Sequence, residues 1–329
     1  MSTLTHWDRV AAALAGAELD HPPVSFWQHF PERDQTATAL ADVTLAWQQQ
    51  FDLDFVKLMP PGDYMTLGWG AQSVYRGSTQ GTRETVHFPV RSLDDWRHIR
   101  PIPLDQGIFR EVIGAARLVN AQINGAAPVL QTIFSPLTTA MKLSAGQAIT
   151  HLRQRPDILH EALAVITEVT RQLVRETLDQ GTPGIFFATQ CASSALLSSA
   201  EYQEFGAPYD LHVLAAAEAS RFTLLHLHGE DVLFADLAGY PVHAINWHDR
   251  RTAPTLAEGQ AQSGRCVVGG VNDQAIPTLT TPELVAHVRA ALDSRLNTRV
   301  MIGPGCVLPL TTPKEHIETM VRVVRGKND

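Results

Sequence analysis

The chain has 329 residues, of which 44% are hydrophobic and 18% are charged, and its formal net charge is −8 at pH 7. This length suits one large domain, or two modest ones, with a full apolar core. A net negative charge does not favour binding to the negatively charged backbone of a nucleic acid. We therefore expect a globular protein whose partner is a small molecule.

The N-terminus and the cysteines indicate the compartment. The first residues, MSTLTHWDRV, lack the charged-then-apolar order of a signal peptide, and no apolar run approaches the roughly 20 residues of a membrane span. Cys191, Cys266 and Cys306 lie far apart, which is typical of a reducing compartment. We expect a cytoplasmic protein with no membrane contact, and a core or loop position for Cys191 and Cys266.

Short runs rich in β-forming residues alternate along the chain with longer amphipathic stretches. The clearest helix covers residues 156–181, where apolar residues recur at helical spacing between a proline and a glycine. In chain order, the predicted strands cover residues 23–28, 54–58, 128–134, 184–189, 222–227, 243–247, 266–270 and 298–303.

This alternation predicts a single α/β domain over residues 1–329. Strands that alternate with helices form parallel βαβ units, and eight strands close a TIM barrel, whereas an open sheet typically uses about five or six. We therefore predict a (β/α)8 TIM barrel. Residues 67–107 are too long for a simple connection and predict an insertion after strand two.

The ends of the predicted strands supply the candidate site residues, because catalytic groups of a barrel lie at the C-terminal ends of its strands. For catalysis this rule selects Asp63, Tyr64 and His248. For substrate binding it selects Gln28, His29, Gln190, Trp247 and Asn272.

A metal site is predicted by His226, His228 and Cys306. The two histidines are two residues apart at the end of the fifth strand, so their side chains leave the same face. Cys306 follows the eighth strand and completes an N,N,S set, which is typical of catalytic zinc with one open position. The alternative is that the histidines are packed polar groups and that Cys306 is a small buried residue.

Two further candidates, the pair Asp63 and Tyr64 and the residue Asn272, have two interpretations each. Asp63 and Tyr64 form an acid/base pair or a substrate clamp, unless Asp63 is a solvated turn residue. Asn272 follows two glycines that allow close backbone approach to a ligand, or else marks a tight turn.

The stretch Thr312-Pro313-Lys314-Glu315 predicts a capping box, with proline as the first helical residue. Residues 210–212 resemble the start of a cobalamin-binding signature, but alanine replaces its glycine and the segment looks helical.

Several segments resemble the superfamily of uroporphyrinogen decarboxylases and corrinoid methyltransferases. GPGCVLPLTTPKEHIETMV resembles its G-C-x-x-P-x-x-T-P-x-E-N-I signature, and LLHLHGED resembles its H-x-C-G segment. FSPLTTAMKLSA, LSSAEYQEFGAPY, AINWHDR and VVGGVND are similar to further family segments, in family order. The resemblance covers nearly the whole chain and implies the same barrel.

The resemblance implies one of two activities. The decarboxylases use no cofactor and hold an acidic tetrapyrrole with arginines and an aspartate, but here SFWQHFPERDQ retains only Arg33. The methyltransferases bind Zn²⁺ through His-x-Cys and a distant Cys, and His228 stands here at the first Cys position. A methyl transfer would need a separate corrinoid protein or another donor, because the chain has no corrinoid domain of its own. A homodimer is compatible with this family.

The leading hypothesis is thus a zinc-dependent, methyltransferase-like enzyme, with His248 or Asp63 as a fourth ligand or acid/base. The second is metal-free decarboxylation of a carboxylated substrate, with Asp63 handling the proton. A metal-dependent hydrolase is a weaker alternative, because its His-x-His pair belongs on the first strand. A non-catalytic barrel that carries a small ligand also stays open.

Overall fold

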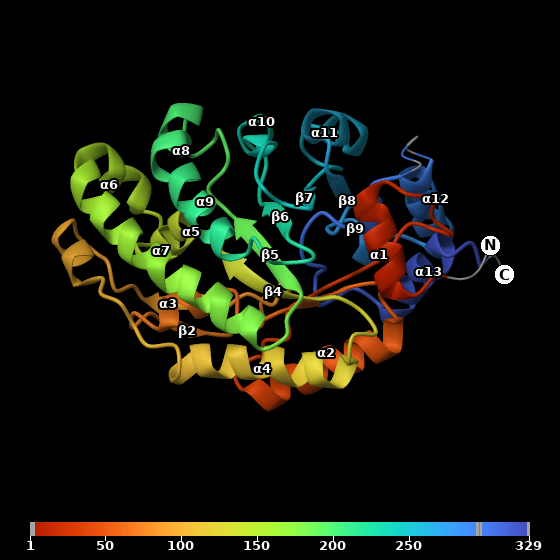
Figure 1. Ribbon diagram of the computed structural model, residues 1–329, viewed down its shortest axis with the longest axis horizontal. Helices are drawn as coiled ribbons and strands as arrows, with labels where there is room; N and C mark the ends of the chain where they lie inside the picture. Colours follow the sequence, from red (N-terminus) through yellow and green to blue (C-terminus); the bar gives the residue numbers. More distant parts are fainter. Residues whose placement is uncertain (1–3, 294–295, 297, 328–329) are drawn as a thin grey trace.

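A curled parallel sheet forms the centre of the computed structural model, which describes residues 4–293, 296 and 298–327 (Figure 1). The sheet has seven strands, and neighbours in the sheet are also neighbours in the chain apart from the excursion between β1 and β4. In order they are β1 (Val56–Leu58), β4 (Val129–Phe134), β5 (Gly184–Thr189), β6 (Leu224–Leu227), β7 (Ala244–Trp247), β8 (Cys266–Val271) and β9 (Val300–Pro304). They coincide with predicted strands two to eight, which confirms the α/β class and the parallel sheet.

The first predicted strand, residues 23–28, is reduced to a single bridge between Val24 and Ile302. The Ser25 N–H donates to the Ile302 carbonyl at 3.0 Å, and the Asp54 N–H donates to the Val24 carbonyl at 2.8 Å. The segment therefore lies between β9 and the start of β1. The predicted six-residue strand is wrong in its extent, because the carbonyls of Phe26 and Trp27 accept hydrogen bonds from outside the sheet, from the Trp47 indole and the Leu308 N–H, each at 2.9 Å.

Helices cover the outer face of the sheet. The longer ones are α1 (His6–Ala15), α2 (Ala37–Phe51), α4 (Gly107–Ile123), α7 (Pro156–Asp179), α9 (Ala207–Ala216), α12 (Thr281–Leu292) and α13 (Lys314–Val324). The shorter ones are α3 (Tyr64–Leu67), α5 (Pro136–Leu143), α6 (Ala148–Gln154), α8 (Ser199–Phe205), α10 (Phe234–Leu237) and α11 (Leu256–Ser263). Helix α7 begins with its proline as predicted, and Gly181 follows its end with φ of 87°.

The predicted capping box before the last helix is wrong. Helix α13 begins at Lys314, and Pro313 is its N-cap with an extended ψ of 139°. Within the described part of the chain, the buried Thr312 hydroxyl has no hydrogen-bond partner. Because Pro313 takes the N-cap position, the Thr312 side chain lies one residue too early to cap the helix.

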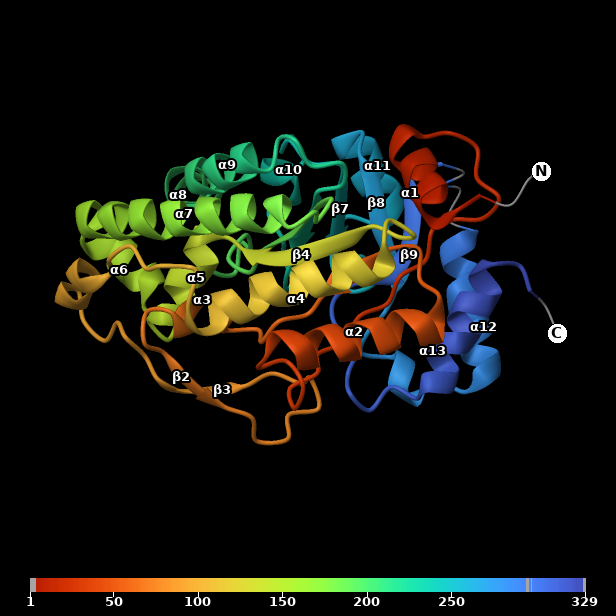
Figure 2. The same cartoon turned by 60° about the horizontal axis from the view of Figure 1, so that its bottom comes forward.

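The connection between β1 and α4 contains elements outside the main sheet. Strands β2 (Gln72–Val74) and β3 (Glu84–His87) form an antiparallel hairpin, and a 3-10 helix η1 (Asp94–His98) follows. Figure 2 shows this hairpin apart from the parallel sheet. The Leu310 N–H donates to the Thr79 carbonyl at 2.7 Å, which ties the hairpin to the loop after β9. That residues 67–107 are an insertion stays a prediction.

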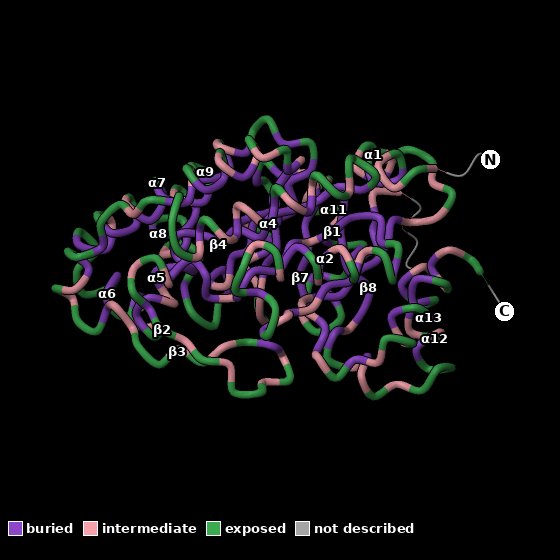
Figure 3. Tube along the Cα trace, turned by 90° about the horizontal axis from the view of Figure 1, so that it is seen from below, coloured by how far each residue is buried: buried purple, intermediate pink, exposed green. Residues whose placement is uncertain are grey.

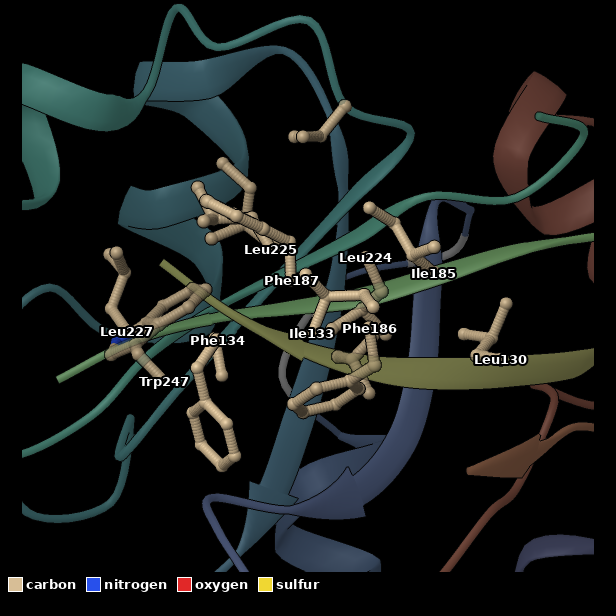
Figure 4. Close-up of a cluster of buried hydrophobic side chains, with 14 of the residues drawn as sticks. Leu130, Ile133, Phe134, Ile185, Phe186, Phe187, Leu224, Leu225, Leu227 and Trp247 are labelled. Carbon is tan, nitrogen blue, oxygen red and sulfur yellow. The ribbon is translucent and has the colours of Figure 1, made fainter. Parts of the chain in front are cut away.

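Apolar side chains on both faces of the strands make the core. Residues of β4 to β9 are buried throughout, as expected for a parallel sheet covered on both sides. Figure 4 shows side chains from neighbouring strands packed together, among them Phe186, Leu224 and Trp247. Buried segments concentrate inside the molecule and exposed ones on helices and loops (Figure 3). That residues 1–329 form one domain stays a prediction, and its outermost residues lie outside the described ones.

Among the described helices, none combines the length and apolar character needed to cross a membrane.

Candidate metal centre

Four potential ligands converge where the strands end. One ligand atom from each of His226, His228, His248 and Cys306 lies within 4.8 Å of the others. Cys306 Sγ lies 3.7 Å from His226 Nε2 and 3.4 Å from His228 Nδ1. His248 Nε2 lies 3.4 Å from His228 Nδ1. The structure thus brings the three predicted ligands together with His248, one of the two candidates for a fourth ligand; we call these four residues the donor cluster.

Strand order and direction explain this convergence. His226 lies in β6 and His228 directly follows it, whereas His248 directly follows β7 and Cys306 follows β9. Because these strands are parallel and close in the sheet, their C-terminal ends meet on one side. Gly229, with φ of 97°, adopts a backbone conformation that favours glycine and turns the chain directly after His228.

His226 is a neutral imidazole in a buried site. Burial lowers its pKa well below the ordinary value, and the neighbouring His228 and His248 act in the same direction. His226 Nδ1 lies 2.6 Å from Asn246 Oδ1, and the ring centroid of Phe186 is 5.4 Å away. A neutral imidazole can offer a lone pair to a metal ion.

His228 has the same character at the rim of a cavity. Burial lowers its pKa to about 4, and the charges of Lys142 and Arg251 contribute. At neutral pH His228 therefore carries no charge, which is the state in which histidine binds metals.

His248 differs because it faces charged groups. Burial alone would lower its pKa, but interactions with Asp273 and Cys306 raise it above the ordinary value. His248 Nδ1 lies 3.7 Å from Asp273 Oδ1, and the Arg251 guanidinium contacts the same nitrogen. The pKa of Asp273 is lowered in spite of its burial, because of its interactions with His248 and Gln274. His248 can therefore act as a ligand or as a proton carrier.

A cavity of about 430 Å³ opens beside the donor cluster. Its wall includes Asp63, Arg83, Thr138, Lys142, Gln190, Cys191 and His228. Lys142 Nζ donates to the Gly62 carbonyl at 2.7 Å, and burial lowers its pKa to about 8. Both carboxylate oxygens of Asp63 are buried and have no hydrogen-bond partner among the described residues. A space of this size suits a small molecule.

Lys57 is a functional candidate that the strand-end rule missed. Its ammonium lies 4.0 Å from the Phe186 ring centroid and 5.5 Å from that of Trp27. Burial lowers its pKa to about 7, an effect that the nearby Cys306 opposes. Lys57 lies inside β1 rather than after it. The available signal was a lysine in the middle of the apolar run FVKLM.

Three predicted residues have side chains that pack or bond within the protein, and their site roles stay predictions. Tyr64 is completely buried, donates its hydroxyl to the Thr132 carbonyl at 2.7 Å, and packs against aromatic rings of the core. Trp247 is also buried and donates to the Pro254 carbonyl at 2.8 Å. Asn272 accepts from the Gln274 N–H at 3.2 Å, which is a local turn.

The two glycines before Asn272 have packing partners within the protein. A Cβ on Gly269 would lie 2.4 Å from an Asp249 oxygen, and one on Gly270 would lie 2.7 Å from the Ala291 Cβ. Gly270 also has φ of 91°. The close approach is therefore to other protein groups.

The remaining predicted residues lie around the cavity or in the core. Gln190 lines the cavity, and its N–H donates to the Thr138 hydroxyl at 2.8 Å. His29 is buried near Gly62 of the cavity wall, and burial, together with Lys57 and Lys142, lowers its pKa to about 3. Gln28 beside it is half-buried.

Cys191 and Cys266 lie in the core or a loop as expected, and the segment that begins at Asp210 is helical as expected. Cys191 and Cys266 are fully buried, and burial raises the pKa of Cys191 to about 12. Asp210 lies in helix α9 and accepts hydrogen bonds from Tyr202 at 2.6 Å and Tyr240 at 3.2 Å. This position confirms that the segment is helical.

Comparisons with known proteins agree with the fold. A family model described as uroporphyrinogen decarboxylase (URO-D) matches residues 5–326. A uroporphyrinogen decarboxylase from Mycobacterium sp. (strain KMS) is 26% identical over 264 residues, covering 73% of this chain and 72% of the relative. A protein of the same name from Xanthomonas oryzae pv. oryzae (strain MAFF 311018) is 26% identical over 307 residues, covering 86% and 83%.

Solved structures share the architecture. A methyltransferase from Methanosarcina mazei superposes with a TM-score of 0.83 at 20% identity, covering 98% of both chains. A B12-independent methionine synthase from Shewanella sp. W3-18-1, in complex with selenomethionine, has a TM-score of 0.62 at 12% identity, covering 93% of this chain and 96% of that one. At these identities the likeness concerns the fold alone.

Proposed function

Because this chain belongs to the uroporphyrinogen decarboxylase family, we propose that it is a zinc-dependent enzyme of the methyltransferase type, with His226, His228 and Cys306 as metal ligands. The observation that carries the proposal is the convergence of three imidazoles and one thiol within 4.8 Å. The proposed scaffold is a one-domain (β/α)8 barrel, in which the segment around Val24 takes the eighth position between β9 and β1.

The donor set fits zinc. Nitrogen and sulfur donors in a tetrahedral set are the ligands that Zn²⁺ prefers, and three protein ligands leave one position for substrate. His226 and His228 are neutral, and Cys306 is a free, half-buried thiol. A zinc ion held there would lower the pKa of a substrate thiol and keep it as thiolate at neutral pH.

The protein's own groups would bind the substrate and move its proton. The cavity beside His228 would hold a small substrate, with Asp63, Lys142 and Gln190 as polar contacts. His248 Nε2 faces the donor cluster while its Nδ1 faces Asp273, so His248 would serve as a fourth ligand or take the substrate's proton.

Histidine at position 228 bears on the substrate. An imidazole in place of a thiolate raises the net charge at the metal, which makes a bound nucleophile more acidic and less nucleophilic. We therefore propose a substrate that differs from those of enzymes with two cysteine ligands. The methyl group would come from a separate corrinoid protein or another donor.

Metal analysis tests this proposal. Purified wild-type protein, loaded with zinc and dialysed, is expected to retain about one zinc ion per chain. Cys306→Ser should retain much less, and Cys266→Ala, which changes a cysteine outside the donor cluster, should match the wild type. Wild-type protein that retains no zinc would contradict the proposal.

A second candidate is metal-free decarboxylation of a carboxylated substrate. It is favoured by the buried Asp63, whose carboxylate has no partner among the described residues and lies at the cavity. Porphyrinogen turnover that is lost in Asp63→Ala but kept in Cys306→Ala would establish it.

A further inference from the structure

Asn246 connects the strands that carry two of the candidate ligands. It lies in β7, is fully buried, and pairs in register with His226 of β6. Its Oδ1 lies 2.6 Å from His226 Nδ1. Its Nδ2 donates to the carbonyls of Val268 at 2.8 Å and Pro304 at 3.1 Å. One amide therefore joins β6, β8 and β9.

These contacts determine which way the amide points. A carbonyl oxygen accepts hydrogen bonds only, so the atom that faces Val268 and Pro304 must be the amide nitrogen. The amide oxygen then faces His226, and the proton between them must belong to His226 Nδ1. This tautomer leaves a lone pair on Nε2, the atom that lies 3.7 Å from Cys306 Sγ.

We propose that Asn246 is a positioning residue that makes His226 Nε2 the metal-binding atom. Through Pro304 it also holds the end of β9, two residues before Cys306, at a constant distance from His226. The inference rests on the proposed metal site and extends it to a residue outside the donor cluster. Groups that bond the second nitrogen of a ligating histidine fix its tautomer and its ring orientation.

A merely structural role for Asn246 makes different predictions from a positioning role. Asn246→Asp keeps an acceptor for His226 Nδ1 but loses both donors and buries a charge. Asn246→Leu keeps the volume and loses the acceptor. If Asn246 only joins strands, the aspartate variant should be at least as impaired as the leucine variant. If it selects the tautomer, the aspartate variant should retain metal binding that the leucine variant loses.

The first experiment measures zinc affinity by chelator competition in full-length wild type and both variants. We expect Asn246→Leu to bind zinc about 10- to 100-fold more weakly. Asn246→Asp should stay within about tenfold of wild type, because a carboxylate increases the basicity of the imidazole. The matched control is Thr132→Val, which removes a buried inter-strand hydrogen bond to Leu58 (2.7 Å) and should leave zinc affinity unchanged.

The second experiment needs no metal. Nitrogen NMR of the histidine rings in metal-free wild type is expected to show His226 protonated at Nδ1. A proton on Nε2 would overturn the inference, as would an Asn246→Leu variant that binds zinc like the wild type. Equal losses of zinc affinity in Asn246→Leu and Asn246→Asp would overturn it too. Failure of wild type to bind zinc would refute the proposed function instead, and the NMR measurement would still decide the tautomer.

Discussion

Buried histidines and charged groups gather at both ends of the parallel sheet, but their hydrogen bonding differs. At the N-terminal end, Arg9 bonds both Asp54 and Asp20, and His6 Nδ1 lies 2.8 Å from Asp54 Oδ1. The second oxygen of Asp54 accepts the Val24 N–H at 2.8 Å. We call His6, Arg9, Asp20 and Asp54 the basal network; in it, opposite charges meet and each carboxylate has partners.

The donor cluster at the other end has the opposite arrangement. His226, His228 and Cys306 bring potential ligand atoms together, and no ion pair among the described residues neutralises Lys57. Cavity size does not distinguish the two ends of the sheet. The hollow at the basal network, about 770 Å³, is larger than the cavity of about 430 Å³ beside the donor cluster. We therefore expect the basal network to stabilise the fold, whereas the donor cluster is the proposed cation site.

Breaking the basal network should have the largest effect on stability. Asp54→Ala removes one of the two carboxylates that neutralise the buried Arg9, so we expect the free energy of unfolding to fall by about 3–5 kcal/mol. Urea denaturation measures it. Asp42→Ala in helix α2, whose carboxylate is 62% exposed and lies 4.0 Å from the Arg33 guanidinium, is the control and should cost less than about 1 kcal/mol. If both variants lost similar amounts of unfolding free energy, the basal network would not stabilise the fold more than an exposed ion pair does.

Adding zinc should stabilise the donor cluster by an intermediate amount. At a free zinc concentration of about 100 times Kd, binding to the folded state adds about 2.7 kcal/mol. The melting temperature of wild type should rise with zinc and return after chelation, and that of Cys306→Ser should respond little. An equal rise in melting temperature in both proteins would show that zinc binds outside the donor cluster.

Removing the amine of Lys57 should stabilise the protein at acidic pH. Its pKa is about 7 in the folded state and 10.5 in the unfolded chain, so the unfolded chain binds more protons between these values and wild-type stability rises with pH there. Lys57→Met lacks this dependence. We expect it to be more stable than wild type by roughly 1–3 kcal/mol at about pH 6, with the difference vanishing near pH 10.5.

Denaturation of Lys57→Met at several pH values tests this expectation. Lys314→Met, which removes an ammonium at an exposed position, is the control. A Lys57→Met variant that is less stable than wild type at pH 6 would show that the ammonium is well solvated.

The smallest effect should come from His6 in the basal network. Its hydrogen bond to Asp54 raises the pKa of His6, which burial opposes, so its contribution is present below the unfolded pKa of about 6.5 and is lost as pH rises through the folded value. His6→Gln should cost about 0.5–1.5 kcal/mol at pH 5.5 and less at pH 8.5. The exposed His87→Gln is the control. A cost that does not depend on pH would argue against a charged His6.

The donor cluster could largely be predicted from the sequence, whereas the basal network was not predicted. The order of seven strands and the convergence of His226, His228 and Cys306 follow from local patterns, because two-residue spacing decides the face of a strand and parallel strands end on one side. The first strand was predicted too long, since the carbonyls of Phe26 and Trp27 bond groups outside the sheet. That Tyr64 and Trp247 act in the site stays a prediction, because a position after a strand does not determine whether a side chain turns toward the cavity or the core.

The sequence by itself thus determined the α/β alternation, the family segments and a pair of histidines with a distant cysteine. Only the tertiary structure decided that His248 joins them, that Asn246 faces His226, and that Lys57 lies on aromatic rings near Cys306. Those relations depend on register between strands and on side-chain direction. Register is set by packing of the whole sheet, which no short segment of the chain encodes.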